Sequence, residues 1–124
     1  MRKIKFRGRD FAGLWHYGDL VHDNMIVCRC GLNVHVHEET VGQFIGKTDK
    51  NGKEIYEGDI LQYNALLRPE KFYRYVIAWN PIETAFGCAS LNQAFSDSPD
   101  ITGGAQIADS IIVGNIHDNP ELLK

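Results

Sequence analysis

The chain has 124 residues, a formal net charge of −3 at pH 7 and a hydrophobic content of 44%. This length and composition suffice for one domain whose core needs neither disulfides nor a metal. The net charge excludes a general attraction to nucleic acid or to an anionic membrane, so any such binding has to be local. Residues 1–11 lack the apolar run of a secretion signal, and no later run approaches the ~20 apolar residues of a membrane helix. We therefore expect a cytoplasmic protein that does not bind membranes.

The first half of the chain predicts short β-strands. Residues 2–9 alternate apolar and basic side chains, which is the period of a half-buried strand. Further strands are predicted over 14–21, 25–30 and 33–37. Asn51-Gly52 is the strongest hairpin signal, and it predicts a type I′ turn in which both residues have positive φ.

The second half also predicts mainly strands. Gly58-Asp59 indicates a tight bend before a strand that reaches about Tyr63. Aromatic and β-branched residues predict strands over 72–79, 85–89 and 111–116. Residues 90–108 are rich in polar turn-formers and predict a long loop with one helical turn near 91–95. Asn119, Pro120 and Glu121 have the order of a cap, a first-turn proline and an acid, so a short helical turn is expected at the end.

Three stretches carry a more specific pattern. They are RKIKFR at 2–7, TVGQFIG and DKNGKEIYEGDI within 40–60, and IVGNIHDNPELL at 112–123, and together they cover about a third of the chain. In this order they resemble the YopX family of phage and prophage proteins, whereas 21–39 shows no family pattern. The resemblance marks these residues as a structural signature: Gly46, Asn51, Gly52, Glu57, Gly58, Asp59, Gly114, Asn115, Asn119 and Pro120.

The resemblance implies a fold and an origin, but no activity. It implies a single domain over 1–124, in which an SH3-like small β-barrel from 46–124 carries the N-terminal strands of 1–45 packed against it. It also implies a phage, prophage or other mobile element as the source. No local motif predicts a nucleophile, a base and an orienting group together, so we do not expect an enzyme.

The cysteines and histidines of the N-terminal half offer one candidate metal site. Cys28, Cys30 and Cys88 are odd in number, and Cys28 and Cys30 diverge from a shared strand face, so reduced thiols are expected. If Leu32-Asn33 is the centre of a hairpin, one face gathers four zinc-type ligands: Cys28, Cys30, His35 and His37. A register slip of one residue would disperse them. The alternative is a partly buried strand with no metal, and we expect no cofactor.

The first strand suggests a second candidate site. Lys3, Lys5, Arg7 and Arg9 form a line of positive charge spaced by about 6.6 Å, and Trp15 or Tyr17 could stack a base. A single-stranded nucleic acid would fit this arrangement. The alternative is a basic strand face that keeps the edge of a sheet soluble.

The leading functional hypothesis is a non-catalytic interaction module that contacts a protein partner or a second copy of itself. It is motivated by the aromatic run of 72–79, in which Tyr73, Tyr75 and Trp79 alternate and predict an outward aromatic face. Burial of that face in the barrel is the competing explanation.

Overall fold

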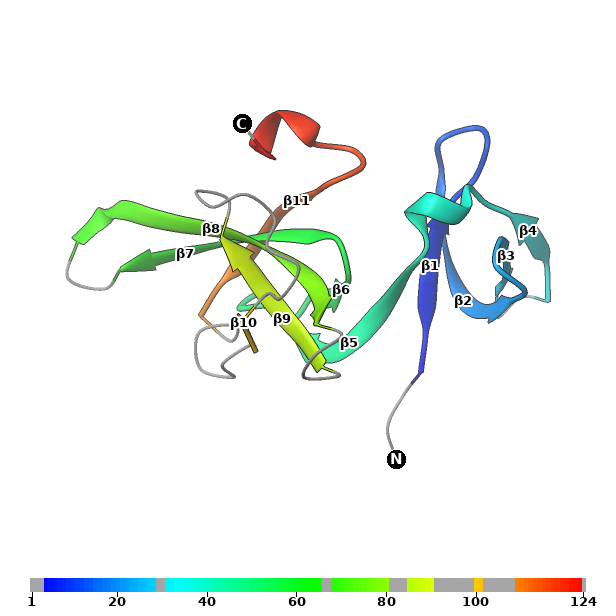
Figure 1. Cartoon of the computed structure of the whole chain (residues 1–124), viewed down its shortest axis with the longest axis horizontal. Helices are drawn as coiled ribbons and strands as arrows, with labels where there is room; N and C mark the ends of the chain where they lie inside the picture. The colour runs from blue at the N-terminus through cyan, green and yellow to red at the C-terminus, as the bar shows by residue number, and fades with distance from the viewer. Residues whose placement is uncertain are drawn as a thin grey trace. The chain divides into compact units, whose positions relative to one another are not determined.

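The computed structural model of the chain describes residues 4–28, 31–65, 68–80, 85–90, 100–101 and 109–123. Within these residues the protein is mainly β, as the sequence predicted, and its strands form two antiparallel sheets. The chain divides into two compact units, Met1–Gly46 and Lys47–Lys124. Figure 1 colours the first unit from blue to cyan and continues through green to red in the second.

The first unit is a meander of short strands. It contains β1 (Phe6–Arg9), β2 (Trp15–Val21), β3 (Met25–Cys28), β4 (Asn33–His35), the 3-10 helix η1 (Glu38–Thr40) and the start of β5 (Gly42–Thr48). The strands lie in the order β4-β3-β2-β1-β5. Ile26 and Val36 are buried in its core, where the absence of a side chain at Gly8 leaves room for Val36. One face of the meander therefore forms a small apolar core.

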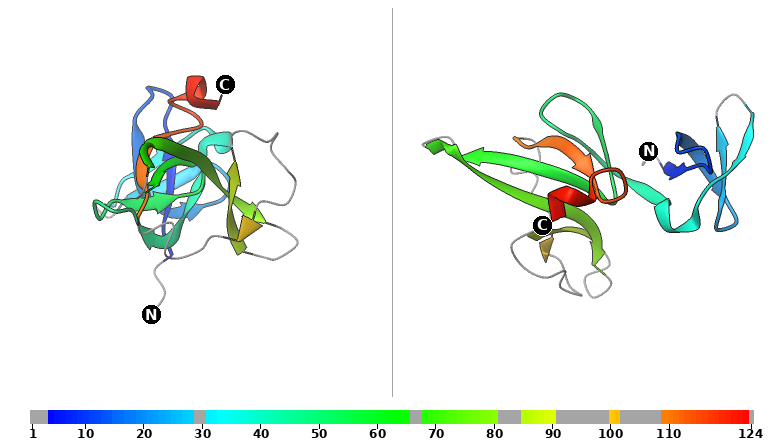
Figure 2. Two further views of the ribbon diagram at one scale, coloured as in Figure 1. Left: turned by 90° about the vertical axis from the view of Figure 1, so that its left-hand side faces the viewer. Right: turned by 90° about the horizontal axis from the view of Figure 1, so that it is seen from above.

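The second unit holds the longer strands. It contains β6 (Glu54–Tyr56), β7 (Asp59–Ala65), β8 (Arg68–Asn80), β9 (Ala85–Ser90), β10 (Asp100–Ile101), β11 (Ile111–Asn115) and the 3-10 helix η2 (Pro120–Leu123). Five of these strands lie in the order β10-β9-β8-β7-β11, and β6 neighbours the end of β5. The right-hand view of Figure 2 shows β11 alongside β7 in this sheet. The arrangement is compatible with the SH3-like small barrel that the resemblance implied.

The core of the second unit comes from β6 and from the neighbouring strands β7 and β8 of the five-stranded sheet. Its buried apolar side chains are Ile55, Tyr56, Ile60, Leu61, Tyr75, Val76 and Ile77. Runs of neighbouring buried residues, such as Val76 and Ile77, indicate strands with both faces covered. The Tyr75 hydroxyl also forms a hydrogen bond with the hydroxyl of buried Ser110, which precedes β11.

Three hairpins share one five-residue turn. The turns are Asp10–Leu14, Cys28–Leu32 and Asp49–Lys53. In each, the first residue donates its N–H to the carbonyl oxygen of the last residue and accepts a hydrogen bond from the fourth residue, which is a glycine. These glycines have φ of +88°, +87° and +82°. A glycine is required there because side chains disfavour positive φ.

The predicted type I′ turn at Asn51-Gly52 is therefore wrong. Gly52 has positive φ but Asn51 does not, which is the pattern of a three-residue loop with a type I turn and a glycine bulge. The physical reason lies in Asp49, whose Oδ1 accepts hydrogen bonds from the N–H groups of Asn51 and Lys53, each at 2.9 Å. These bonds stabilise the longer loop, which the dipeptide alone does not specify.

Most of the predicted strands are confirmed, with shifted ends. β2, β8, β9 and β11 correspond to the predictions over 14–21, 72–79, 85–89 and 111–116. The first strand begins at Phe6 instead of residue 2, and Ile4 and Lys5 are not part of it. β10 was not predicted. The helical turn predicted near 91–95 lies outside the described residues. The final helical turn is present as η2.

Candidate functional site

Most residues of the family signature lie in turns or at strand ends, whereas Gly46 and Gly114 lie within β5 and β11. Gly46, Gly52 and Gly58 all have positive φ, with Gly58 in the turn that Glu57 begins. Gly58 donates its N–H to the Ile77 carbonyl, and its own carbonyl accepts from the N–H of Ile116. The buried carboxylate of Asp59 accepts from the N–H of Tyr56 at 2.8 Å. These contacts hold β6, β7 and β8 in register.

The signature residues near the C-terminus form a similar local network. The side-chain oxygen of Asn115 accepts hydrogen bonds from the N–H groups of His117 and Asp118, each at 2.9 Å. The Asn119 side-chain oxygen accepts from the N–H of Asn115 at 3.2 Å, so this side chain reaches back along the chain. A Cβ at Gly114 would lie 2.5 Å from that oxygen. Pro120 then begins η2. His117 and Asp118 thus belong to a structural turn.

The basic first strand packs its cations onto aromatic rings. The Arg7 guanidinium lies 4.8 Å from the centre of the Trp15 ring and Arg9 lies 6.0 Å from it, while the Lys5 ammonium lies 5.6 Å from the Phe44 ring. Arg7 is buried, with a relative exposure of 7%. Lys3 lies outside the described residues. Trp15, predicted to stack a base, is therefore paired with arginines from the neighbouring strand.

The hairpin register behind the zinc hypothesis is wrong. In the observed pairing of β3 with β4, His35 lies opposite Met25, and Cys28 donates its N–H to the Leu32 carbonyl. His35 therefore lies on the opposite face of the hairpin from Cys28. His37 packs edge-on against Phe11, and Cys30 lies outside the described residues. No group of three or more metal-ligating side chains occurs in the part of the chain that the structure describes.

The predicted outward aromatic face of β8 is also corrected. Tyr75 is buried and bonded to Ser110, because this strand has a core on both faces. Trp79 is exposed and packs edge-on against Phe86 at 5.1 Å between ring centres. The side chain of Tyr73 lies outside the described residues.

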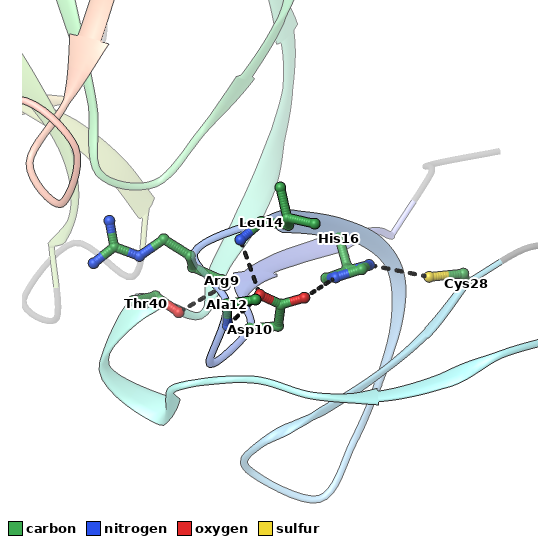
Figure 3. A network of polar contacts seen from close by, with 7 residues as sticks. All are labelled: Arg9, Asp10, Ala12, Leu14, His16, Cys28 and Thr40. Atoms are coloured by element: carbon green, nitrogen blue, oxygen red, sulfur yellow. Dashed lines mark hydrogen bonds and ion pairs between the residues drawn. The ribbon is translucent and has the colours of Figure 1, made fainter.

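A different cluster joins the start of the β1–β2 turn to β2 and β3: Asp10, His16 and Cys28 (Figure 3). His16 Nε2 lies 2.7 Å from Asp10 Oδ2, and His16 Nδ1 lies 4.0 Å from Cys28 Sγ. The side chains of His16 and Asp10 are 23% and 17% exposed, and Cys28 is half-buried. The imidazole thus lies between a carboxylate and a thiol, with partial access to solvent.

Backbone hydrogen bonds fix the carboxylate of this cluster. Asp10 Oδ1 accepts from the N–H groups of Ala12 and Leu14, each at 2.9 Å, which leaves Oδ2 for His16. The hydrogen bond from His16, together with those from Leu14 and Ala12, holds the pKa of the Asp10 carboxyl below its usual value. Asp10 is therefore ionised at neutral pH and acts only as an acceptor. In the neutral imidazole, the proton of His16 is then on Nε2, and the lone pair of Nδ1 points toward Cys28.

Sequence reasoning missed Asp10 and His16 although a signal was available. Asp10 begins an Asp-x-x-Gly-x turn, and the same pattern begins at Asp49. In both turns the aspartate Oδ1 accepts hydrogen bonds from backbone N–H groups of the turn, and Oδ2 contacts a residue outside it. The outside partner of Asp10 is His16, and that of Asp49 is the N–H of Ile112 at 3.0 Å. Recognising the repeated pattern would have placed a carboxylate beside the start of β2. The position of Cys28 on β3 requires the tertiary register.

These features define a small, mainly β protein with two antiparallel sheets. Most of its signature residues lie in turns. The YopX protein family profile matches residues 16–124, and the chain belongs to this family. A crystal structure of the protein EF1440 from Enterococcus faecalis is similar, with a TM-score of 0.60 and 24% identity over 100% of both chains. That likeness concerns the fold. No match to a protein of curated function was found. Among the described residues, no helix has the length and hydropathy needed to cross a bilayer.

Proposed function

We propose that this YopX family protein is a non-catalytic interaction module of a bacteriophage or another mobile element, working in the bacterial cytoplasm by assembling with a second copy of itself. The contact surface is the outer face of β2 and β3, defined by Tyr17, Val21, Met25 and Val27. The composition of this face is the observation that supports the proposal.

The strand registers define this face. Val21 lies opposite Met25, and Tyr17 alternates with buried Gly18 on β2. The other face of the same strands carries the core residue Ile26, so the odd-numbered positions point outward. Tyr17 and Val21 are 47% and 38% exposed, and Met25 and Val27 are partly exposed. All four lie on one side of the hairpin, which also carries exposed Asp19 opposite Val27, and Arg7 of β1 lies opposite Tyr17 on the same side.

Several partly or fully exposed apolar side chains on the outer face of one hairpin are unusual for a sheet of this kind. Antiparallel sheets with one solvated face normally place polar side chains there. The described residues include seven large hydrophobic side chains that are exposed, and all except Trp79 belong to the first unit. Two of them, Tyr17 and Val21, lie on the outer face of β2, and exposed apolar side chains that share a surface are typical of protein interfaces.

Sedimentation velocity and native mass spectrometry test the proposal. We expect the purified protein to form a defined oligomer and the double variant Tyr17→Glu/Val21→Glu to be monomeric with an unchanged melting temperature. Ile4→Glu is the matched control, because Ile4 is 62% exposed but precedes β1. A parent protein that stays monomeric at high micromolar concentration would contradict self-assembly. A salt-sensitive complex with a short oligonucleotide would instead favour a nucleic-acid partner.

A further inference from the structure

The cluster of Asp10, His16 and Cys28 has a chemistry that the interaction module does not use. We propose that Cys28 is a thiol–disulfide exchange site, in which His16 takes the thiol proton, Asp10 positions His16, and the reaction partner is a small uncharged disulfide. This inference does not depend on the proposed assembly.

The order of the three groups supports proton transfer from the thiol. Only a thiolate attacks a disulfide, and an imidazole with its lone pair toward the thiol can accept the proton. His16 Nδ1 lies 4.0 Å from Cys28 Sγ, and Nε2 donates to Asp10 Oδ2 at 2.7 Å. Once protonated, the imidazolium is stabilised by the carboxylate of Asp10, which is the general logic of a thiol paired with a histidine and an acid.

The strand registers determine which charged groups lie around His16. His16 lies opposite Gly8 on β1, and Cys28 lies opposite Gly18 on β2, so all four share the inner face with Ile26 of β3. Arg7 and Arg9 point to the other face, toward Trp15. Val34 and Val36 complete the inner face from β4 and the residue after it. Asp10 and Cys28 are therefore the titratable groups that face His16 from the described parts of β1 to β4.

The surroundings of the thiol favour an uncharged reaction partner. The β1–β2 and β3–β4 turns lie at the same end of the meander, because successive strands run in opposite directions. These turns carry exposed Phe11, Leu14 and Leu32, with exposed fractions of 72%, 63% and 64%. Among the described residues, exposed apolar side chains thus lie at this end of the meander, which suits an uncharged reaction partner.

The exchange balances without another reactant. The proton of the Cys28 thiol moves to His16 Nδ1, and the thiolate attacks one sulfur of the disulfide. The new bond to Cys28 Sγ forms as the original S–S bond breaks, and the leaving thiolate takes the proton back from His16. Cys28 is oxidised to a mixed disulfide, and the other half of the reagent is reduced to a thiol.

The test measures the reaction of full-length protein with 4,4′-dithiodipyridine as a function of pH. Cys30→Ser/Cys88→Ser serves as the parent, so that Cys28 is the single thiol. We expect one adduct, and a rate profile whose midpoint lies at least about one pH unit below the ~8.5 of an ordinary cysteine. A less basic thiolate is also a weaker nucleophile. Each pH unit by which the midpoint is lowered therefore raises the rate at pH 6.5 only about three- to fourfold.

Two variants separate proton transfer from a structural role. Asp10→Asn keeps an oxygen for the turn but presents an N–H₂ to His16 Nε2, which forces the imidazole proton onto Nδ1. His16→Gln removes the base. In both we expect the midpoint to return to about 8.5. Asp49→Asn is the matched control, because the same turn there has no histidine, and it should leave the profile unchanged.

Each outcome decides for or against the site. A parent midpoint near 8.5 overturns it, as does a low midpoint that neither variant moves. A change caused by Asp49→Asn as large as that caused by Asp10→Asn would show that turn stability governs the rate. Should Asp10→Asn fail to fold by circular dichroism, the profile of His16→Gln decides alone, and His16→Asn replaces it if needed.

Discussion

Replacing Gly18 with alanine should disrupt the first unit. Gly18 lies in the middle of β2 opposite Cys28, and a Cβ there would overlap the Val27 carbonyl oxygen and lie 2.9 Å from the Val27 carbonyl carbon. These are backbone atoms of the neighbouring strand, so the clash cannot be relieved by a side-chain rotation. β2 and β3 would have to separate, which weakens the four pairs that join them.

The expected cost is a large fraction of the unit's stability. Overpacking costs about 1–3 kcal/mol, and loosening about two backbone hydrogen bonds adds about 1 kcal/mol for each bond, giving about 3–5 kcal/mol. A unit the size of Met1–Gly46 has a free energy of unfolding of about 2–7 kcal/mol. Gly18→Ala should therefore leave the first unit largely unfolded in water.

Urea titration followed by tryptophan fluorescence can measure this effect. The chain has two tryptophans, Trp15 in the first unit and Trp79 in the second, so a Trp79→Phe background reports on the first unit. Gly13→Ala is the control. Gly13 has φ of +88° and no atom within 4 Å of an added Cβ, so only backbone strain of about 1–2 kcal/mol is expected. Equal shifts of the unfolding midpoint in the two variants would refute the steric argument.

Three further predictions concern the shared turns. Gly52→Ala should lower the free energy of unfolding by about 1–2 kcal/mol because φ is +82°. Asn51→Ala should lower it by less than about 1 kcal/mol. Equal losses in urea titrations would instead support a type I′ turn. Asp49→Ala removes the acceptor of three backbone N–H groups and should cost about 2–4 kcal/mol, measured by the same titration; a loss below about 1 kcal/mol would show that the turn forms without it. The lowered pKa of Asp10 stabilises the folded state above the unfolded pKa of about 4, and this contribution is lost as the pH falls through the folded pKa. Acid titration of Trp15 fluorescence should therefore show a stability loss below about pH 4 that Asp10→Ala lacks; identical acid profiles would contradict this.

The sequence by itself determined the mainly β class and the positions of most strands. Both follow from local physics, since alternation along 14–21 and the aromatic and β-branched residues of 72–79 suit strands, and glycines such as Gly52 and Gly58 mark turns. Part of the family signature could be recognised because its residues act locally, although Gly58 also bonds to Ile77 and Ile116. The hydrogen bonds of Asn115, for example, reach only a few positions along the chain.

Tertiary structure alone decided which side chains meet. The β3–β4 register depends on how the Cys28–Leu32 turn closes and on the burial of Ile26, and a register shift by an odd number of residues moves His35 to the other face. Residues that are far apart in sequence, such as Asp10 and Cys28, come together only when three strands have paired. No local pattern contains that information, because pairing is set by the free energy of burying one face of the whole meander.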